Sequence, residues 1–125
     1  MSELKLKEEI EQTLPHFRGT EKYYRLSPSF AYTDGIEYLA DKAGCYWLVD
    51  LVSSYQKDLK DKHFQVWEVK VNLDKQTAVI TAYDGESENT NLPEIVRQEL
   101  EFTDFPLESI KLYCVDGVLF LPSEY

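Results

Sequence analysis

The chain has 125 residues and a formal net charge of -10, from 23 acidic and 13 basic residues. This length fits one domain over residues 1–125, and the 43% share of hydrophobic residues excludes a disordered tail. The negative charge disfavours direct binding to nucleic acid or to an anionic membrane surface, because both of those partners are negatively charged themselves.

Two cysteines, Cys45 and Cys114, stand far apart in the sequence and form no CxxC pattern. We expect both to be reduced, buried thiols of a cytoplasmic protein. The N-terminal residues lack the apolar core of a signal peptide, and no run approaches the ~20 apolar residues of a membrane span. The two histidines, His16 and His63, are also far apart, so we expect no metal site and no cofactor.

The N-terminal part of the chain predicts one short helix followed by irregular structure. Ser2 can cap this helix, which ends at Pro15 because the residue before a proline avoids the helical region. Residues 19–29 show no clear period. We therefore expect an irregular or loosely extended segment there, with a turn at Ser27-Pro28-Ser29.

Two further helices are predicted on either side of Gly44. Asp34 is expected to cap the second helix, and Gly44 is expected to end it in the left-handed conformation. The third helix is expected to run from Cys45 to about Leu59 or Lys60 and to form the core of the fold. Its apolar stripe comprises Leu48, Leu51, Val52 and Tyr55, with Cys45, Trp47 and Val49 beside it.

From residue 64 onward the apolar period changes to two, which predicts β-strands joined by short connections. We expect strands at residues 64–73, 77–83, 92–103, 110–114 and 118–121. A helix opened by Pro93 is the alternative for residues 92–103, but the alternation of Val96, Leu100 and Phe102 favours a strand. The acidic, turn-rich residues 84–91 are expected to form an exposed mobile loop.

Short connections make neighbouring strands antiparallel. The predicted fold class is therefore α+β, with the N-terminal helices packed on one face of a roughly five-stranded antiparallel sheet in two layers. Asp116-Gly117 lies between two apolar runs and is typical of a tight hairpin turn. The last strand, residues 118–121, is too apolar to stay bare at the edge of a sheet, so self-association through it is one expectation.

Five short stretches stand out among these elements. They are Tyr32-Thr-Asp-Gly35, Tyr46-Trp-Leu-Val-Asp50, Phe64-Gln-Val-Trp67, Thr103-Asp-Phe-Pro106 and Leu121-Pro-Ser-Glu-Tyr125. Together they resemble a family of small bacterial proteins that carry a domain of unknown function. The resemblance covers the chain from about Tyr23 to its C-terminus, and it implies no activity, cofactor or catalytic residue.

Cys45 is the strongest candidate for chemistry in the sequence. It precedes a predicted helix, whose N-terminal dipole can lower the pKa of a thiol, and His63 follows before the first predicted strand. This order resembles the layout of papain-like thiol hydrolases, although the glycine and serine residues that flank the cysteine in that family are absent. A cysteine-dependent hydrolase using Cys45 and His63 is therefore the alternative function, and a buried thiol that packs the helix start is the simpler explanation.

Tyrosine occurs nine times, and the aromatic residues together exceed what a core of this size can enclose. Tyrosine and tryptophan are common anchors of protein interfaces, so the leading hypothesis is a non-catalytic protein-interaction module that binds a protein partner or itself. The residues expected to form the interaction surface are Tyr23, Tyr24, Tyr32, Asp84, Glu86 and Glu88. A narrower version is an acidic inhibitor or nucleic-acid mimic that uses the carboxylates of residues 84–101 with Glu108 and Glu124.

Overall fold

The computed structural model describes residues 3–18, 22–85 and 94–124. Its helices are α1 (Glu3–Thr13), α2 (Asp34–Ala43) and α3 (Tyr46–Tyr55), with 3₁₀ helices at Leu14–His16, Gln56–Asp58 and Pro122–Glu124. Its strands are β1 (Tyr23–Ser27), β2 (Phe30–Thr33), β3 (Phe64–Asn72), β4 (Thr77–Asp84), β5 (Glu94–Leu100), β6 (Ser109–Val115) and β7 (Val118–Phe120).

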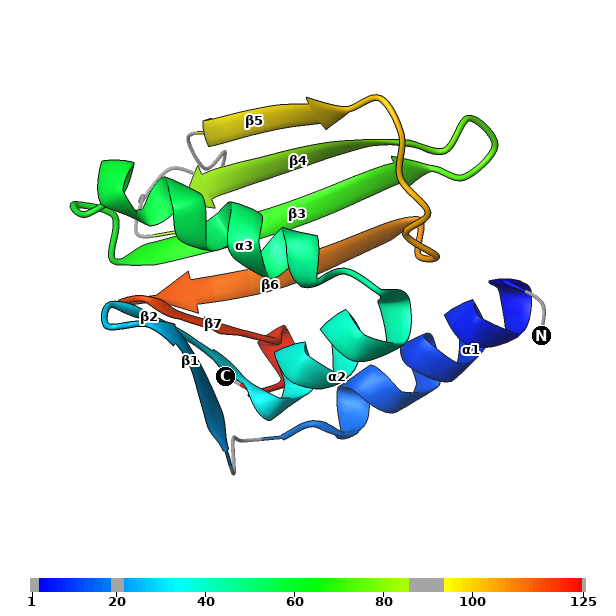
Figure 1. Ribbon diagram of the computed structural model, residues 1–125, viewed down its shortest axis with the longest axis horizontal. Helices are drawn as coiled ribbons and strands as arrows, with labels where there is room; N and C mark the ends of the chain where they lie inside the picture. Colours follow the sequence, from blue (N-terminus) through cyan, green and yellow to red (C-terminus); the bar gives the residue numbers. More distant parts are fainter. Residues whose placement is uncertain (1–2, 19–21, 86–93, 125) are drawn as a thin grey trace.

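The strands form one sheet in the order β1-β2-β7-β6-β3-β4-β5, and the helices lie on one face of it (Figure 1). Every neighbouring pair is antiparallel except β2 and β7, which run parallel. The predicted α+β class is confirmed. The prediction of about five antiparallel strands was partly wrong, since the sheet has seven strands and is mixed.

The two additional strands are β1 and β2, which form a hairpin before the central helices. Residues 23–27 were predicted to be irregular because an edge strand exposed on both sides has no apolar alternation. The predicted turn at Ser27-Pro28-Ser29 lies between the two strands. β2 pairs with β7 in parallel because α2, α3 and four strands separate them in sequence, so the short-connection rule does not apply to this pair.

β7 is not an edge strand, so the predicted self-association through residues 118–121 has no free edge to use. It lies between β6 and β2, and the outer strands of the sheet are β1 and β5. The Ala31 N–H donates to the Gly117 carbonyl at 2.8 Å, which starts the parallel pairing. The Asp116-Gly117 hairpin itself is confirmed, with both residues at positive φ.

The C-terminal end of α2 lies where the sequence predicts it, whereas the N-cap of α2 and the C-terminal end of α3 differ from the prediction. Gly44 ends α2 in the left-handed conformation, as predicted, with φ 63°. The N-cap is Thr33 rather than Asp34, because the Thr33 hydroxyl accepts from the Ile36 N–H at 3.3 Å. α3 ends at Tyr55, earlier than predicted, and continues as the 3₁₀ helix Gln56–Asp58.

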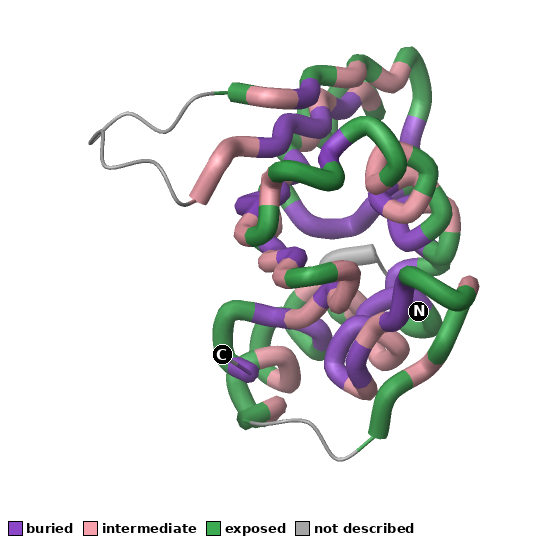
Figure 2. Tube along the Cα trace, turned by 90° about the vertical axis from the view of Figure 1, so that its left-hand side faces the viewer, coloured by how far each residue is buried: buried purple, intermediate pink, exposed green. Residues whose placement is uncertain are grey.

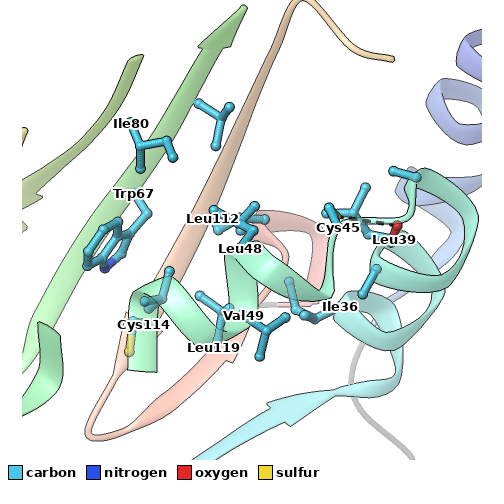
Figure 3. Packing of buried hydrophobic residues seen from close by; sticks show 14 of the residues in the cluster. Ile36, Leu39, Cys45, Leu48, Val49, Trp67, Ile80, Leu112, Cys114 and Leu119 are labelled. Carbon is cyan, nitrogen blue, oxygen red and sulfur yellow. Dashed lines mark hydrogen bonds between the residues drawn. The ribbon is translucent and has the colours of Figure 1, made fainter. Parts of the chain in front are cut away.

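The core lies between the helices and the sheet, where Leu48 and Val49 of α3 pack among buried residues of the strands (Figure 3). Trp67 is fully buried, and its indole N–H donates to the Gln65 side-chain oxygen at 2.9 Å. Trp47 is half-buried at the side of α3. The predicted role of α3 in the core is confirmed, since Leu48, Val49 and Val52 of this helix are buried. Figure 2 shows the buried positions along the chain in purple.

The other face of the sheet carries aromatic side chains at one end. The ring centroids of Phe64 and Tyr113 are 5.3 Å apart, and those of Tyr113 and Phe120 are 5.9 Å apart. No helix covers this face in Figure 1. In the part of the chain that the structure describes, no helix is long and apolar enough to cross a membrane.

Candidate functional site

The structure brings two of the predicted interaction residues into direct contact. Tyr24 on β1 pairs with Tyr32 on β2, and their rings stack with centroids 5.4 Å apart and planes at 13°. Neighbouring side chains of a strand point to opposite faces, so Tyr23 lies on the other side of the hairpin, where it is 60% exposed. The hairpin therefore presents a tyrosine pair on the side of the sheet that the helices occupy.

The predicted acidic residue that the structure describes, Asp84, lies elsewhere in the fold. Asp84 ends β4, and three strands separate β4 from β2 in the sheet. Its carboxylate lies 3.6 Å from the Lys62 ammonium nitrogen. Glu86 and Glu88 fall outside the described residues, as does most of the predicted loop at residues 84–91. The structure thus does not place Asp84 beside the tyrosine pair.

A third tyrosine and its acidic partner extend the surface, and neither was among the residues expected to form it. Tyr46 is the first residue of α3, is 42% exposed, and donates a hydrogen bond of 2.5 Å to the Glu37 carboxylate on α2. This contact crosses the turn at Gly44, so it depends on the angle between two helices. The only sequence signal was the position of Glu37 in the first turn of α2, which is typical of a capping residue.

Two hydroxyl groups of this surface, those of Tyr32 and Tyr46, have raised pKa values. Burial, followed by the charge of Glu37 and a hydrogen bond to it, raises the pKa of Tyr32, and Asp50 adds to this effect. The hydrogen bond to Glu37 is the largest cause of a raised pKa for Tyr46, and the nearby charge of Asp41 raises this pKa further. The negative charge of the surface therefore belongs to the carboxylates alone.

We call this surface the tyrosine–carboxylate face. It consists of Tyr24, Tyr32, Glu37, Asp41, Tyr46 and Asp50. The Lys22 ammonium nitrogen lies 4.8 Å from the centre of the Tyr24 ring, at the edge of the face. Neutral aromatic rings beside carboxylates form a surface that attracts a cation, since both the ring faces and the carboxylates are electronegative.

Cys45 is enclosed in the core, where it forms the N-cap of α3. Its Sγ lies 3.7 Å from the Leu39 carbonyl oxygen, to which it donates (Figure 3). Burial is the largest effect on this thiol and raises its pKa to about 12, so the thiol is protonated at neutral pH. An activated nucleophile requires the opposite shift.

His63 is not near this thiol. Its imidazole Nδ1 lies 3.0 Å from an Asp116 carboxylate oxygen, and both side chains are exposed. His63 borders a cavity with Ser53 and Ser54, at the C-terminal end of α3, whereas Cys45 precedes the helix. A helix of 10 residues is about 15 Å long, so the structure does not bring the two candidate catalytic residues together.

Two carboxylates of the proposed nucleic-acid mimic, those of Glu124 and Glu108, have partners within the protein. Glu124 is buried, so its predicted place on the surface was wrong. Its carboxylate accepts hydrogen bonds from the Thr33 hydroxyl and the Leu121 N–H. Glu108 forms an ion pair with Lys7 at 3.6 Å. Over the described ranges, no group of three or more His, Cys, Asp or Glu side chains is arranged to hold a metal ion.

Comparison with known proteins gives one match. The model of a family described as a family of unknown function (DUF6876) matches residues 8–125. The predicted resemblance to a family of unknown function is thereby confirmed, and the match begins upstream of Tyr23, where the resemblance was expected to start. No curated protein and no solved structure matches the chain.

Proposed function

Because the chain belongs to a family of unknown function, DUF6876, we propose its role from the geometry of its surface. The protein is a non-catalytic interaction module that binds a basic segment of a partner protein through the tyrosine–carboxylate face. The observation that carries this proposal is the stack of Tyr24 on Tyr32, with centroids 5.4 Å apart, beside the carboxylates of Glu37 and Asp50.

Lys22 supports a cationic occupant. Its ammonium nitrogen lies 4.8 Å from the centre of the Tyr24 ring, so this ring already holds a cation of the protein itself, which the cation of a partner would replace. Such a contact is worth about 0.5–1 kcal/mol at an exposed site and about 2 kcal/mol when it is desolvated. Arginine suits the face better than lysine, because its planar guanidinium both stacks on rings and pairs with a carboxylate through two hydrogen bonds.

The tyrosine hydroxyls contribute to binding as neutral groups. Tyrosine hydroxyls are neutral at pH 7, and the raised pKa values of Tyr32 and Tyr46 extend this neutral state to higher pH, so neither group neutralises the charge of a partner. The hydrogen bond from Tyr46 to Glu37 also fixes one ring and one carboxylate before a partner arrives. A site that is already ordered loses less conformational entropy on binding.

The charge of the whole chain favours the same class of partner. A net charge of -10 attracts a basic segment and accelerates its association, and this effect declines with salt because exposed charges are screened beyond about 10 Å at 0.1 M. The protonated, enclosed Cys45 thiol favours an interaction role over a thiol hydrolase.

The proposal places the protein in the cytoplasm. Both cysteines are free, buried thiols, which is typical of proteins in a reducing compartment. A bacterial source, which the sequence resemblance implies, remains a prediction.

The test is the affinity of short peptides that carry arginine, measured by fluorescence anisotropy against matched peptides with glutamine in place of arginine. The arginine peptides should bind with a finite affinity that falls as salt rises. Tyr24→Ala should weaken this binding about tenfold, which corresponds to about 1.4 kcal/mol. Tyr23→Ala is the matched control, because it removes the same ring from the other side of the same strand.

A second pair of variants separates the face from the overall charge. Asp50→Asn and Asp58→Asn each remove one exposed carboxylate, but Asp58 lies beyond the end of α3. Only Asp50→Asn should weaken the arginine peptide. The tyrosine–carboxylate face would be excluded as the site if each variant and its matched control lost the same affinity for the arginine peptide. It would also be excluded if the glutamine peptide bound as tightly as the arginine peptide.

A further inference from the structure

A cavity of about 700 Å³ opens beside the C-terminal end of α3, whereas Tyr46 of the tyrosine–carboxylate face begins this helix. Its walls come from the last turn of α3 and the segment after it, from the turn between β1 and β2, and from the turn between β6 and β7. These segments are distant in sequence and meet only in the folded chain. Small-molecule sites in proteins have volumes of about 300–1,000 Å³, so the cavity has the size of such a site.

We infer that this cavity binds a small phosphorylated molecule through its phosphate group. Lys57, Lys60 and Lys62 line it together with His63, and among the described lining residues Asp116 is the only carboxylate. The lining residues thus carry three ammonium groups and one carboxylate, an excess of positive charge among the side chains that border the cavity in a chain with a net charge of -10. A cavity lined by one sign of charge concentrates ligands of the opposite sign.

Part of this charge is already balanced within the protein. The Asp116 carboxylate lies 3.0 Å from Nδ1 of His63, so it is directed at the imidazole. The Lys62 ammonium lies 3.7 Å from Asp61 and 3.6 Å from Asp84. Lys62 is therefore paired with two carboxylates that lie outside the lining, and the lysines that remain for a ligand are Lys57 and Lys60.

Lys57 and Lys60 carry that potential. Both are exposed, and over the described ranges of the chain no carboxylate oxygen lies within 4.0 Å of either ammonium nitrogen. The dipole at the C-terminus of α3 does not account for them, since it is equivalent to only about half an elementary charge. Two ammonium groups are therefore available to an anion that enters the cavity.

The rest of the lining fits a phosphate attached to a carbon skeleton. The hydroxyl groups of Ser27, Ser29 and Ser53 supply neutral donors, which together with lysine can satisfy the several oxygens of a phosphate. Phe30 and Leu59 also line the cavity and are buried, so its floor is apolar. An organic phosphate can contact both the polar and the apolar residues of the lining, whereas inorganic phosphate can contact only the polar ones.

The test is an NMR titration that follows the imidazole signals of the two histidines at constant ionic strength. The probes are glycerol 3-phosphate, adenosine 5′-monophosphate and inorganic phosphate, with glycerol and adenosine as unphosphorylated controls. The organic phosphates should shift the His63 signals in a saturable way and leave those of His16 unchanged, because His16 lies in the 3₁₀ helix Leu14–His16, outside the cavity lining. Inorganic phosphate should bind more weakly.

The inference is overturned if no probe gives saturation, if the unphosphorylated controls act equally, or if inorganic phosphate binds more tightly than both organic phosphates. The double variant Lys57→Ala/Lys60→Ala should weaken the binding of the organic phosphates by at least about tenfold, since it removes the two ammonium groups that have no carboxylate partner among the described residues. Lys70→Ala/Lys75→Ala is the matched control, because both lysines are exposed and the charge change is the same. Equal weakening in both double variants also overturns the inference.

Discussion

The Thr33 hydroxyl donates a hydrogen bond of 2.7 Å to the Glu124 carboxylate, across 91 residues of sequence. The same carboxylate oxygen accepts from the Leu121 N–H at 2.9 Å, and the Thr33 oxygen accepts from the Ile36 N–H. The C-terminal 3₁₀ helix is therefore joined to the N-cap of α2. This contact supports the proposed site, because the first turn of α2 carries Glu37.

Removing this buried carboxylate should destabilise the fold. Glu124→Ala leaves two buried donors without an acceptor and should lower the free energy of unfolding by about 2–3 kcal/mol. Glu124→Gln retains a side-chain oxygen and should cost less. Urea denaturation measures both, with Ser123→Ala as the control, since the hydrogen bond from Ser123 to the Leu14 carbonyl is exposed. Equal effects of Glu124→Ala and Ser123→Ala would contradict the prediction.

The effect of a substitution at Gly35 should depend on the contact between Thr33 and Glu124. A Cβ at this position would lie 2.5 Å from the Glu124 carboxylate oxygen and 2.7 Å from a Leu121 methyl carbon. Gly35→Ala should therefore displace the carboxylate and destabilise the protein in denaturation experiments. Its cost should shrink in a Glu124→Ala background, because both changes disrupt one contact. Full additivity in this double-mutant cycle would show that the two residues act independently.

Two glycines with positive φ offer a matched comparison. Gly44 has φ 63° and nothing within 4 Å of an added Cβ, so Gly44→Ala should cost only the left-handed strain of about 1–2 kcal/mol. Gly117 has φ 82°, and its Cβ would lie 2.4 Å from the Ser29 carbonyl oxygen. Gly117→Ala should therefore cost about 3 kcal/mol or more, because backbone overlap adds to the strain. Thermal and urea unfolding of both variants measure the difference, and equal losses would refute this account of the β6–β7 turn.

The Cys45 thiol should make stability depend on alkaline pH. Burial raises its pKa from 9.0 in an ordinary environment to about 12, so the unfolded chain releases the proton first as pH rises. The contribution of the buried thiol is full below pH 9 and is lost between pH 9 and about 12, with a slope of about 1.4 kcal/mol per pH unit. Cys45→Ala should show a shallower decline over this range in urea denaturation. The same slope in both proteins would mean that the thiol titrates normally.

Elements with a strong period could be predicted from the sequence. Alternation identified β3, β4 and β6, and helical spacing identified α3, since each buries one face. β1 was missed because both of its faces are largely exposed, so its residues carry no alternation. Thr33 and Asp34 are adjacent and both are good capping residues, so the sequence does not distinguish between them. In the structure the capping residue, Thr33, also forms a hydrogen bond with Glu124, which no local sequence pattern indicates.

The residues of the candidate sites could likewise be predicted only where a pattern in the sequence indicates them. Tyr24 and Tyr32 could be named because aromatic residues in excess of the core must reach the surface. The contact between Tyr46 and Glu37 could not, since it depends on how α2 and α3 meet at Gly44. The cavity beside the lysines after α3 could not be predicted either, since only the fold brings the β1–β2 and β6–β7 turns to it.

The most direct test of the account is a map of the backbone amide shifts of the protein, recorded by NMR during titration with an arginine-containing peptide. The account predicts saturable shifts that cluster on β1, β2 and the first turns of α2 and α3, around the stack of Tyr24 on Tyr32. Shifts spread evenly over all acidic surfaces, or centred on the hollow lined by Trp47 and Phe102, would contradict it.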